Sequence, residues 1–389
     1  MVMKNTNVLI SGAGIGGPAL AYWLNRYGHT VTVVERAPGP RPGGQAVDFK
    51  GATHLTVLER MGILDDVRRL QTGGTDQEIV DADDRRLAVL PGEFTGGELE
   101  ITRGDLARLL YEKSAAAGCQ YVFGDSITSI TETSGGAHVT FEHGAPRTFD
   151  LVVGADGIHS NVRRLAFGPE SDHVRFLGHY YALAEGLGSL GSVAKMYNEP
   201  GRMVATGGPG AAAFFVFASP QLDFDRYDTE EMKRIVIDAY AGMGWRTSTV
   251  IEMVRHAHDF YLDSISQVRV EHYSKGRTVL LGDAAYGNTL GGFGTGLAMV
   301  GAYVLAGELA AAGGDHRVAF QRYEEEFRGY AKIARNGNAG PFMAPGTPRR
   351  IRMRNAMFKH RLMLKMMLKM TDVFATNITL KDYPSLVRH

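Results

Sequence analysis

Cysteine and net charge are scarce in this sequence. Its 389 residues include one cysteine, so no disulfide can form within the chain and no cysteine-based metal site is expected. A lone thiol suits a reducing compartment, and we expect a cytoplasmic protein. The 42 basic and 42 acidic residues cancel, so the overall charge does not favour nucleic acid as a partner.

Long hydrophobic runs are also missing. The apolar stretches are strand-length or are interrupted by glycine and charge, so no integral membrane association is expected. The apolar run near the N-terminus, Val8 to Ile10, is too short for a signal peptide. The histidines are scattered without the spacing of metal ligands, and no metal site is expected.

Glycine, by contrast, is abundant, with 49 residues, and its first cluster indicates a binding site. Gly12-Ala13-Gly14-Ile15-Gly16-Gly17 is a G-x-G-x-x-G sequence between the apolar run 7–10 and a helical pattern that ends at Gly28. Its first glycine allows a tight turn, Gly14 lets a pyrophosphate approach the backbone, and Gly17 lets helix and strand pack closely.

A second strand follows this helix. The run 30–34 is β-branched, and Glu35 stands at its end, where an acid binds a ribose hydroxyl. The first 36 residues therefore predict a βαβ unit that binds a dinucleotide. Its candidate contacts are Gly12, Gly14, Ile15, Gly16, Gly17, Glu35 and Arg36.

Two later segments place an aspartate at the end of an apolar strand. They are Gly154-Ala155-Asp156-Gly157 and Gly282-Asp283-Ala284-Ala285. Open α/β sheets bind ligands at that edge. Gly-Asp turns are common by chance, but two of them together with the G-x-G-x-x-G turn, in this order and spacing, are not.

The pattern changes between about residues 174 and 270. Strand-like runs such as 212–217 and 260–268 dominate there around one helix, which Asp228 opens with Glu231 as its capping-box partner. This pattern of strand-like runs predicts a β-rich layer inserted between segments of the nucleotide-binding part.

Together the motifs resemble the class A flavoprotein monooxygenases, which share the para-hydroxybenzoate hydroxylase-like fold. The resemblance is to the bacterial branch of tetracycline-inactivating and aromatic-polyketide hydroxylases, and it runs from about Asn7 to Leu309. It implies an α/β fold: a Rossmann-like FAD-binding domain of the GR2 type, with a parallel sheet, an inserted β-rich substrate-binding layer and a C-terminal helical segment. We divide the chain accordingly into an FAD-binding domain (1–172 and 271–320), the β-rich layer (173–270) and the helical segment (321–389).

The resemblance also implies roles for individual residues. Glu35 is expected at the adenosine ribose, Arg103 against FAD, and Asp283 at the ribityl–pyrophosphate region. Asp156 lies in a motif tied to both FAD and NAD(P)H. The loop 39–51, which contains Gln45, resembles the segment beside the isoalloxazine.

The sequence departs from the family pattern after Asp283. Many members read Gly-Asp-Ala-Ala-His, then Pro, then Gly-Gln-Gly, whereas here Tyr286 stands at the histidine, no proline occurs and Phe293 stands at the glutamine. Backbone N–H groups at the start of the next helix, at Gly294, Thr295 and Gly296, would still face the flavin and stabilise its reduced form. The change at Phe293 instead puts the polarity of the substrate side in question.

The family chemistry implies FAD, O2 and a nicotinamide co-substrate, with NADPH preferred over NADH. No second G-x-G-x-x-G occurs, which indicates that the nicotinamide visits transiently. In this family O2 forms a flavin C4a-hydroperoxide, and its distal oxygen passes to the substrate. Because the flavin carries the chemistry, the sequence identifies no catalytic side chain.

Apolar residues of the β-rich layer are candidates for the substrate pocket. Phe215 and Phe217 alternate along a strand and therefore share one face. For each such residue alone a core position is the commoner role, but together they favour a polycyclic, aromatic or terpenoid small molecule. The complete candidate set is Tyr181, Met196, Met203, Phe215, Phe217 and Phe293.

Several alternatives remain open at this stage. The chain could be an FAD-dependent reductase or dehydrogenase that inserts no oxygen, or a non-catalytic flavoprotein that sequesters a ligand. A halogenase is disfavoured because its Trp-x-Trp-x-Ile-Pro motif is absent and the only tryptophans, Trp23 and Trp245, lie far apart. The basic, methionine-rich segment 349–369 is either a membrane-surface or partner helix or, as we favour, a helix that packs across the domains. We expect a monomer or weak homodimer.

Overall fold

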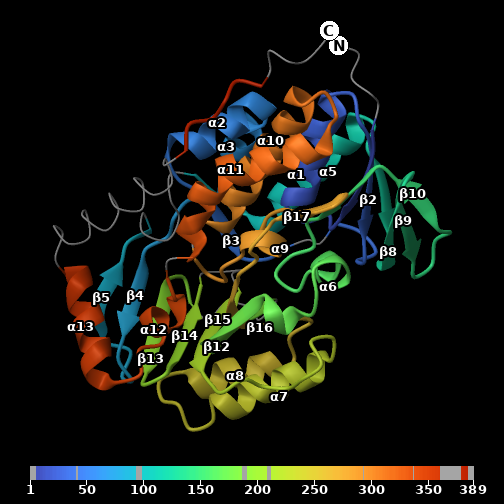
Figure 1. Cartoon of the computed structure of the whole chain (residues 1–389). Coiled ribbons are helices and arrows are strands. Elements are labelled where there is room, and N and C mark those ends of the chain that lie inside the picture. Colours follow the sequence, from blue (N-terminus) through green and yellow to red (C-terminus); the bar gives the residue numbers. More distant parts are fainter. Residues whose placement is uncertain are drawn as a thin grey trace.

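The computed structural model describes residues 6–40, 43–92, 99–185, 191–207, 212–291, 293–335, 337–359 and 378–383. The structure has two main layers, each built on one large sheet (Figure 1).

The first sheet belongs to the part of the chain that we predicted to bind FAD, here called the FAD-binding part. Its strand order is β17-β18-β11-β1-β2-β7, and every neighbouring pair is parallel except β17 with β18. The central strands are buried Val, Leu and Ile runs, as expected for a parallel sheet covered on both faces. The strands are β1 (Asn7–Ser11), β2 (Thr30–Glu35), β7 (Gln120–Phe123), β11 (Leu151–Gly154), β17 (Ser274–Lys275) and β18 (Thr278–Leu280).

Helices pack on this sheet and on one another. Helix α1 contacts both α5 and α10, and α10 contacts α2 and α11 (Figure 1). Thr102 caps α5 by accepting a hydrogen bond from the Asp105 N–H, as its sequence pattern indicates. The helices are α1 (Gly16–Arg26), α2 (Gly51–Met61), α3 (Leu64–Arg69), α5 (Arg103–Ala116), α10 (Gly294–Ala311) and α11 (His316–Arg335).

Helix α10 is the one helix among the described residues that is long and apolar enough to cross a membrane. Its mean hydropathy is 1.3, but 83% of its residues are buried inside the protein. Buried apolar neighbours on all sides make it the core helix of the FAD-binding part.

The second sheet forms the β-rich layer that we predicted to bind substrate, here called the substrate layer, and we refer to it as the substrate sheet. Its strand order is β16-β12-β15-β14-β13-β4-β5, and all pairs are antiparallel except β13 with β4. The strands are β4 (Gln77–Val80), β5 (Arg86–Leu90), β12 (Val174–Glu185), β13 (Ala194–Glu199), β14 (Arg202–Thr206), β15 (Ala213–Ala218) and β16 (Asp259–Val268).

Strands β4 and β5 require a correction to the expected division of the chain. They lie within 1–172, which we assigned to the FAD-binding domain, yet they pair into the substrate sheet. Their short amphipathic runs do not show which sheet they complete, because that is decided by a partner strand more than a hundred residues later in the chain.

Two helices, α7 (Thr229–Ala239) and α8 (Thr247–Arg255), cover one face of the substrate sheet (Figure 1). We expected only one. Asp228 caps α7 as predicted, by accepting from the backbone N–H groups of residues 230 and 231. The Glu231 carboxylate does not close a capping box, because it accepts from the Asp225 N–H instead.

Smaller elements complete the fold. Strands β8 (Ile127–Thr133), β9 (Gly136–Phe141) and β10 (Arg147–Phe149) form a separate sheet, and β3 (Ala46–Phe49) pairs with β6 (Leu99–Thr102). The remaining helices are α6 (Asn161–Ala166), η1 (Glu170–Asp172), α9 (Asp283–Tyr286), α12 (Ala339–Met343) and α13 (Pro348–Lys359). Helix α13 packs beside β5 and β13, and the methionines expected to continue it lie outside the described residues.

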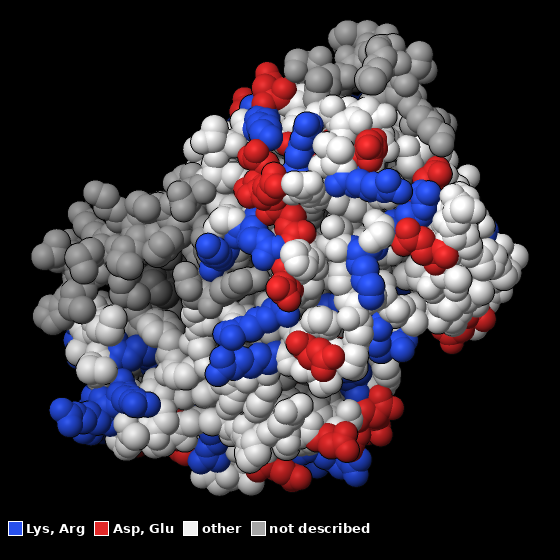
Figure 2. All heavy atoms as spheres, in the orientation of Figure 1, with Lys and Arg blue, Asp and Glu red and all other residues white. Residues whose placement is uncertain are grey.

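The surface charge is mixed. Basic and acidic side chains are interspersed over the face drawn in Figure 2, in keeping with their equal numbers. Helix α13 differs, because its exposed side chains include Arg349, Arg350 and Arg352 and its described residues include no acid.

Candidate functional site

The glycine-rich turn joins β1 to α1, and its glycines are required for different reasons. Gly12 has a φ of +104°, and a Cβ there would lie 2.5 Å from the Ala155 carbonyl oxygen. A Cβ on Gly17 would lie 1.9 Å from the Gly12 carbonyl oxygen. A Cβ on Gly14, in contrast, would meet no protein atom within 4 Å. The fold therefore requires Gly12 and Gly17, whereas Gly14 leaves open space beside the start of α1.

Glu35 ties this turn to the end of β2. Its two carboxylate oxygens accept hydrogen bonds from the N–H groups of Ala13 and Ala37, each at 2.8 Å. Glu35, which the sequence predicts to bind a ribose hydroxyl, therefore also orders the glycine-rich turn. The next residue, Arg36, is exposed, stacks 4.0 Å from the ring of Tyr227 and donates to its hydroxyl.

Asp156 joins the ends of β11 and β1 to α6. Its carboxylate accepts from the Val162 N–H at 3.0 Å and from the hydroxyls of Ser11 and Ser160. Burial raises its pKa, and these hydrogen bonds oppose that rise. Asp156 therefore shapes the edge of the sheet where Ala155 meets the glycine-rich turn.

Arg163 links the two aspartate motifs, a role that the sequence did not reveal. It is fully buried, and its guanidinium donates to the carbonyl oxygens of Ile158 at 2.7 Å and Ala284 at 2.9 Å. The second of these lies in α9, directly after Asp283. The only sequence feature that could have indicated this role is an arginine four residues after Gly-Ile-His.

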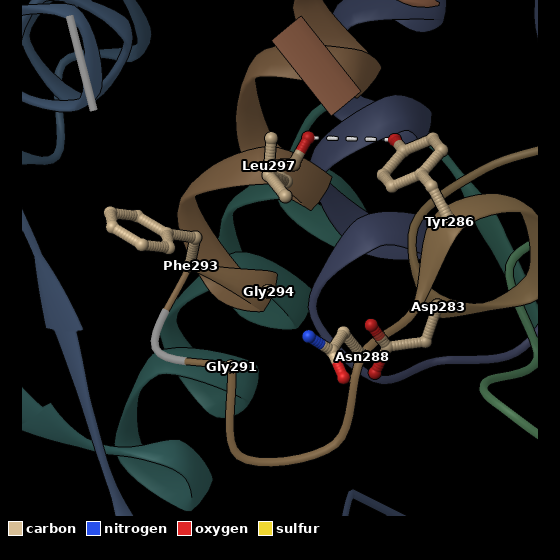
Figure 3. Close-up of a pocket in the computed structure, with 7 residues that line it drawn as sticks. All are labelled: Asp283, Tyr286, Asn288, Gly291, Phe293, Gly294 and Leu297. Atoms are coloured by element: carbon tan, nitrogen blue, oxygen red, sulfur yellow. Dashed lines mark hydrogen bonds between the residues drawn. The ribbon is translucent and has the colours of Figure 1, made fainter. Parts of the chain in front are cut away.

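Asp283 lines a recess at the start of α10. The recess is formed by Asp283, Tyr286, Asn288, Gly291, Phe293, Gly294 and Leu297 (Figure 3). The side chain is exposed, yet surrounding protein raises its pKa, which indicates a carboxylate inside a concavity. The positive charge of Arg103, the first residue of α5, opposes this rise, so the two predicted cofactor residues lie close enough for their charges to interact.

Tyr286, which replaces the family histidine, belongs to the base of this recess. Its hydroxyl points to the Leu297 carbonyl oxygen at 3.5 Å (Figure 3), and its ring packs against Tyr273 and Phe327. Burial raises its pKa, so it remains a neutral phenol. Phe293 precedes α10 and is one of the lining residues, and its ring centroid lies 5.8 Å from the Lys50 ammonium.

His54 is a second residue that the sequence analysis missed. Its Nδ1 accepts from the Lys50 N–H at 3.0 Å, and its Nε2 lies 2.9 Å from the Tyr330 hydroxyl. Burial lowers its pKa to about 4, so the ring is neutral. It packs against Gly296 and thereby fixes the first turn of α10 between α2 and α11.

The loop that contains Gln45 connects both layers. The Gln45 carbonyl oxygen accepts from the Arg103 N–H at 3.1 Å. The neighbouring Gly44 N–H donates to Glu185 Oε1, at the end of β12, at 2.8 Å. The segment expected beside the isoalloxazine is thus held against α5 and the substrate sheet together.

The predicted pocket residues fall on opposite faces of the substrate sheet. Tyr181, Met196 and Met203 share the face that carries Phe214 and Leu290, and all three are buried in that cluster. Phe215 and Phe217 do share one face, as their alternation indicates, but it is the face covered by α7 and α8. Both rings contact Tyr240 at 5.2 and 6.0 Å. The prediction that they line the pocket is therefore wrong, because alternation defines a face without showing what covers it.

The site fits the adenine dinucleotide part of FAD. Neither a left-handed backbone conformation nor a close protein neighbour requires glycine at position 14. A pyrophosphate packed against the backbone of Gly14 would require it. The N-terminus of α1 supplies free N–H groups and a partial positive charge at the same place. Among the described residues no group of His, Cys, Asp or Glu side chains could hold a metal ion.

Comparison with known proteins identifies the class. Residues 5–334 match the model of the FAD binding domain family, and the chain belongs to that family. It is 36% identical over 339 residues to a "Flavin-dependent monooxygenase" of Legionella longbeachae, covering 84% of this chain and 86% of that protein. An uncharacterized protein of Mycobacterium tuberculosis is 39% identical over 344 residues, with 84% and 90% covered.

Comparison with solved structures supports the same class of protein. The crystal structure of tetracycline destructase Tet(55) matches with a TM-score of 0.81 and 31% identity, over 98% of this chain and 100% of that one. The protein is a flavin-dependent monooxygenase of class A type, and the predicted family, fold class and FAD cofactor are confirmed.

Proposed function

We propose that this monooxygenase uses NADPH or NADH and O2 to insert one oxygen atom into an apolar, aromatic or polycyclic natural product. When bound, FAD supplies the redox chemistry, taking a hydride from the nicotinamide and activating O2. The chain's own residues bind, orient and exclude water around it.

The single observation that carries the proposal is the recess at the start of α10. Asp283 and the first turn of α10 line it, the charge of Arg103 acts on Asp283, and Leu290 of the neighbouring loop packs against the Tyr181 face of the substrate sheet. In this arrangement the Gly14 turn and Asp283 would hold the ADP and ribityl parts of FAD. The N–H groups of residues 294–296 would stabilise negative charge on the reduced ring.

The substrate class rests on the lining of the opposite face. Phe214 and Leu290, which are partly buried beside Tyr181, offer aromatic and aliphatic surface. Such surface suits a flat, polycyclic molecule better than a small acid. The similarity to tetracycline destructases favours an antibiotic or another polyketide, in biosynthesis or in detoxification. We also propose a cytoplasmic monomer or weak homodimer.

The test is direct. The purified protein should be yellow and show a flavin spectrum, and tetracyclines and other aromatic polyketides should stimulate NADPH oxidation. Mass spectrometry should then find a product that has gained one oxygen atom. NADPH oxidation with a product that has gained two hydrogen atoms and no oxygen would identify a reductase instead, and loss of two hydrogen atoms without NADPH oxidation would identify a dehydrogenase. Ligand binding without any NADPH oxidation would identify a sequestering protein.

A further inference from the structure

Helix α13 exposes basic side chains that no acid of the same helix balances. Arg349, Arg350 and Arg352 are all exposed, and the helix contains no Asp or Glu. Within the part of the chain that the structure describes, no acidic side chain forms an ion pair with any of the three. Exposed arginines of other helices are balanced locally, since Arg68 in α3 and Arg108 in α5 each pair with an aspartate three residues earlier. Basic side chains accordingly gather over α13, at the lower left of Figure 2.

Arg354 determines which side of α13 faces outward. Its side chain is buried, and its guanidinium donates to the carbonyl oxygens of Phe342 and Met343 at 3.1 and 3.0 Å. It also donates to Asn198 Oδ1, on β13, at 2.7 Å. Phe358, one turn further on, packs into an apolar cluster of the substrate sheet. These contacts hold one side of the helix against the substrate sheet, so the opposite side faces solvent.

The outward side places an apolar side chain among basic ones. Met353 is 63% exposed and lies four residues after Arg349, so the two share one stripe of the helix. Arg350 lies on one side of this stripe, whereas Arg352 and Lys359, seven residues apart, lie on the other. Long basic side chains around an exposed apolar group are typical of helices that lie in a membrane interface, because their charged ends reach the headgroups.

A second apolar side chain lies at the margin of the helix. Phe342, in α12, is 36% exposed, and its ring centroid lies 6.1 Å from that of Phe358. The main chain of Phe342 is fixed by its hydrogen bond from Arg354, so α12 and α13 present their surfaces as one unit. Charge and apolar surface therefore occur together on this part of the molecule.

We propose that the outward side of α13 docks the protein on a membrane surface that contains anionic lipid. Its arginines would contact lipid phosphates, and Met353 would enter the boundary of the acyl chains. The two roles that the sequence suggested for this segment are then compatible, because packing and docking use opposite sides of the helix. The docking is peripheral and does not depend on the proposed function, although a bilayer would also concentrate an apolar substrate.

A nucleic acid or an acidic protein is the competing partner for a basic helix. Such a partner would pair with the arginines but offers no apolar layer for Met353, whereas a bilayer offers phosphates and an apolar layer together. The overall charge of zero also gives no long-range attraction to nucleic acid. The combination of charge with an exposed methionine therefore favours lipid.

The experiment measures cosedimentation of the FAD-loaded protein with phosphatidylcholine vesicles that contain or lack phosphatidylglycerol. Each basic residue near an anionic surface strengthens binding about fivefold, so the anionic vesicles should bind at least about tenfold more tightly. Raising NaCl from about 0.05 to 0.5 M should remove most of this preference, because salt shortens the range of the attraction. Equal binding to the two kinds of vesicle would overturn the inference.

Two double variants test whether α13 is the docking surface. Arg349→Gln/Arg352→Gln should weaken binding to the anionic vesicles by more than about tenfold. The matched control is Arg317→Gln/Arg322→Gln, which removes the same charge from exposed positions of α11 and should bind like the wild type. Bound FAD and the thermal midpoint show that each variant is folded. Equal losses in the two variants would mean that net charge, and not this helix, governs binding.

Met353→Ser tests the kind of partner. It should weaken binding to the anionic vesicles by about threefold to tenfold, because a methionine side chain is no longer transferred from water, and it should leave binding to heparin unchanged. Vesicle binding as tight as that of the wild type would identify a general polyanion site and overturn the assignment to lipid. A protein that binds anionic vesicles as expected but adds oxygen to no compound would overturn the proposed function alone.

Discussion

The His54 ring occupies the space into which a side chain at Gly296 would project. A Cβ at that position would lie 2.0 Å from the imidazole. The ring cannot move away easily, because the Lys50 N–H and the Tyr330 hydroxyl hold its two nitrogens. Glycine at the first turn of α10 is therefore required by a protein neighbour, in addition to any ligand.

We predict that Gly296→Ala destabilises the protein by about 1–3 kcal/mol, the usual cost of overpacking a well-filled core. Chemical denaturation of the FAD-free protein measures it. Gly329→Ala is the matched control, since Gly329 lies in α11 with nothing within 4 Å of its Cβ position, and it should be neutral or slightly stabilising. Equal effects of the two substitutions would contradict the proposed contact.

Gly14→Ala should separate cofactor binding from folding. Because its Cβ meets no protein atom, the FAD-free protein should keep its stability, while the methyl group should weaken FAD binding by about tenfold or more. Gly17→Ala is the contrasting variant, because its Cβ would overlap the Gly12 carbonyl oxygen and should impair folding itself. Flavin titration and thermal unfolding distinguish the two, and unchanged FAD affinity in Gly14→Ala would speak against a pyrophosphate at this turn.

Phe214 and Phe215 are adjacent in the sequence, but substituting one should affect substrate binding and substituting the other should affect stability. Phe215 is fully buried under α7, so Phe215→Ala should cost about 3–5 kcal/mol of stability and leave ligand preference alone. Phe214 is partly buried beside Tyr181 on the opposite face, so Phe214→Ala should mainly raise KM for an aromatic substrate. If Phe215→Ala changed KM selectively, our assignment of the two faces would be wrong.

His159 forms ion pairs with Glu170 and Asp263. Because of these pairs, the free energy of unfolding should decrease at alkaline pH. The folded-state pKa of His159 is raised to about 9 from 6.5, so its contribution is complete below pH 6.5 and disappears as the pH rises through about 9. The expected loss is on the order of 2 kcal/mol, allowing for partial exposure of the group. Thermal midpoints across this range should decline less steeply in His159→Gln, while His256→Gln, on the exposed end of α8, should follow the wild type.

The sequence predicted the parts of the fold that depend on local patterns. The G-x-G-x-x-G turn, the Asp228 cap and the buried runs of the parallel sheet all have local causes, and each lies where it was expected. Contacts between distant segments were missed, among them the His54–Gly296 packing, the Arg163 bridge and the ion pair between His159 and Asp263. A lone histidine or arginine shows no periodicity, so its partners become visible only when the two layers are brought together.

The entry of β4 and β5 into the substrate sheet has a consequence for assembly of the molecule. Early-synthesised residues form one rim of a sheet whose other strands emerge much later from the ribosome, so neither layer is a continuous stretch of polypeptide. A fragment limited to 173–270 would present an unpaired β13 as an open edge, and such edges recruit other chains. The two layers should therefore unfold in a single cooperative transition, and dissecting the protein into separately expressed halves should yield aggregates.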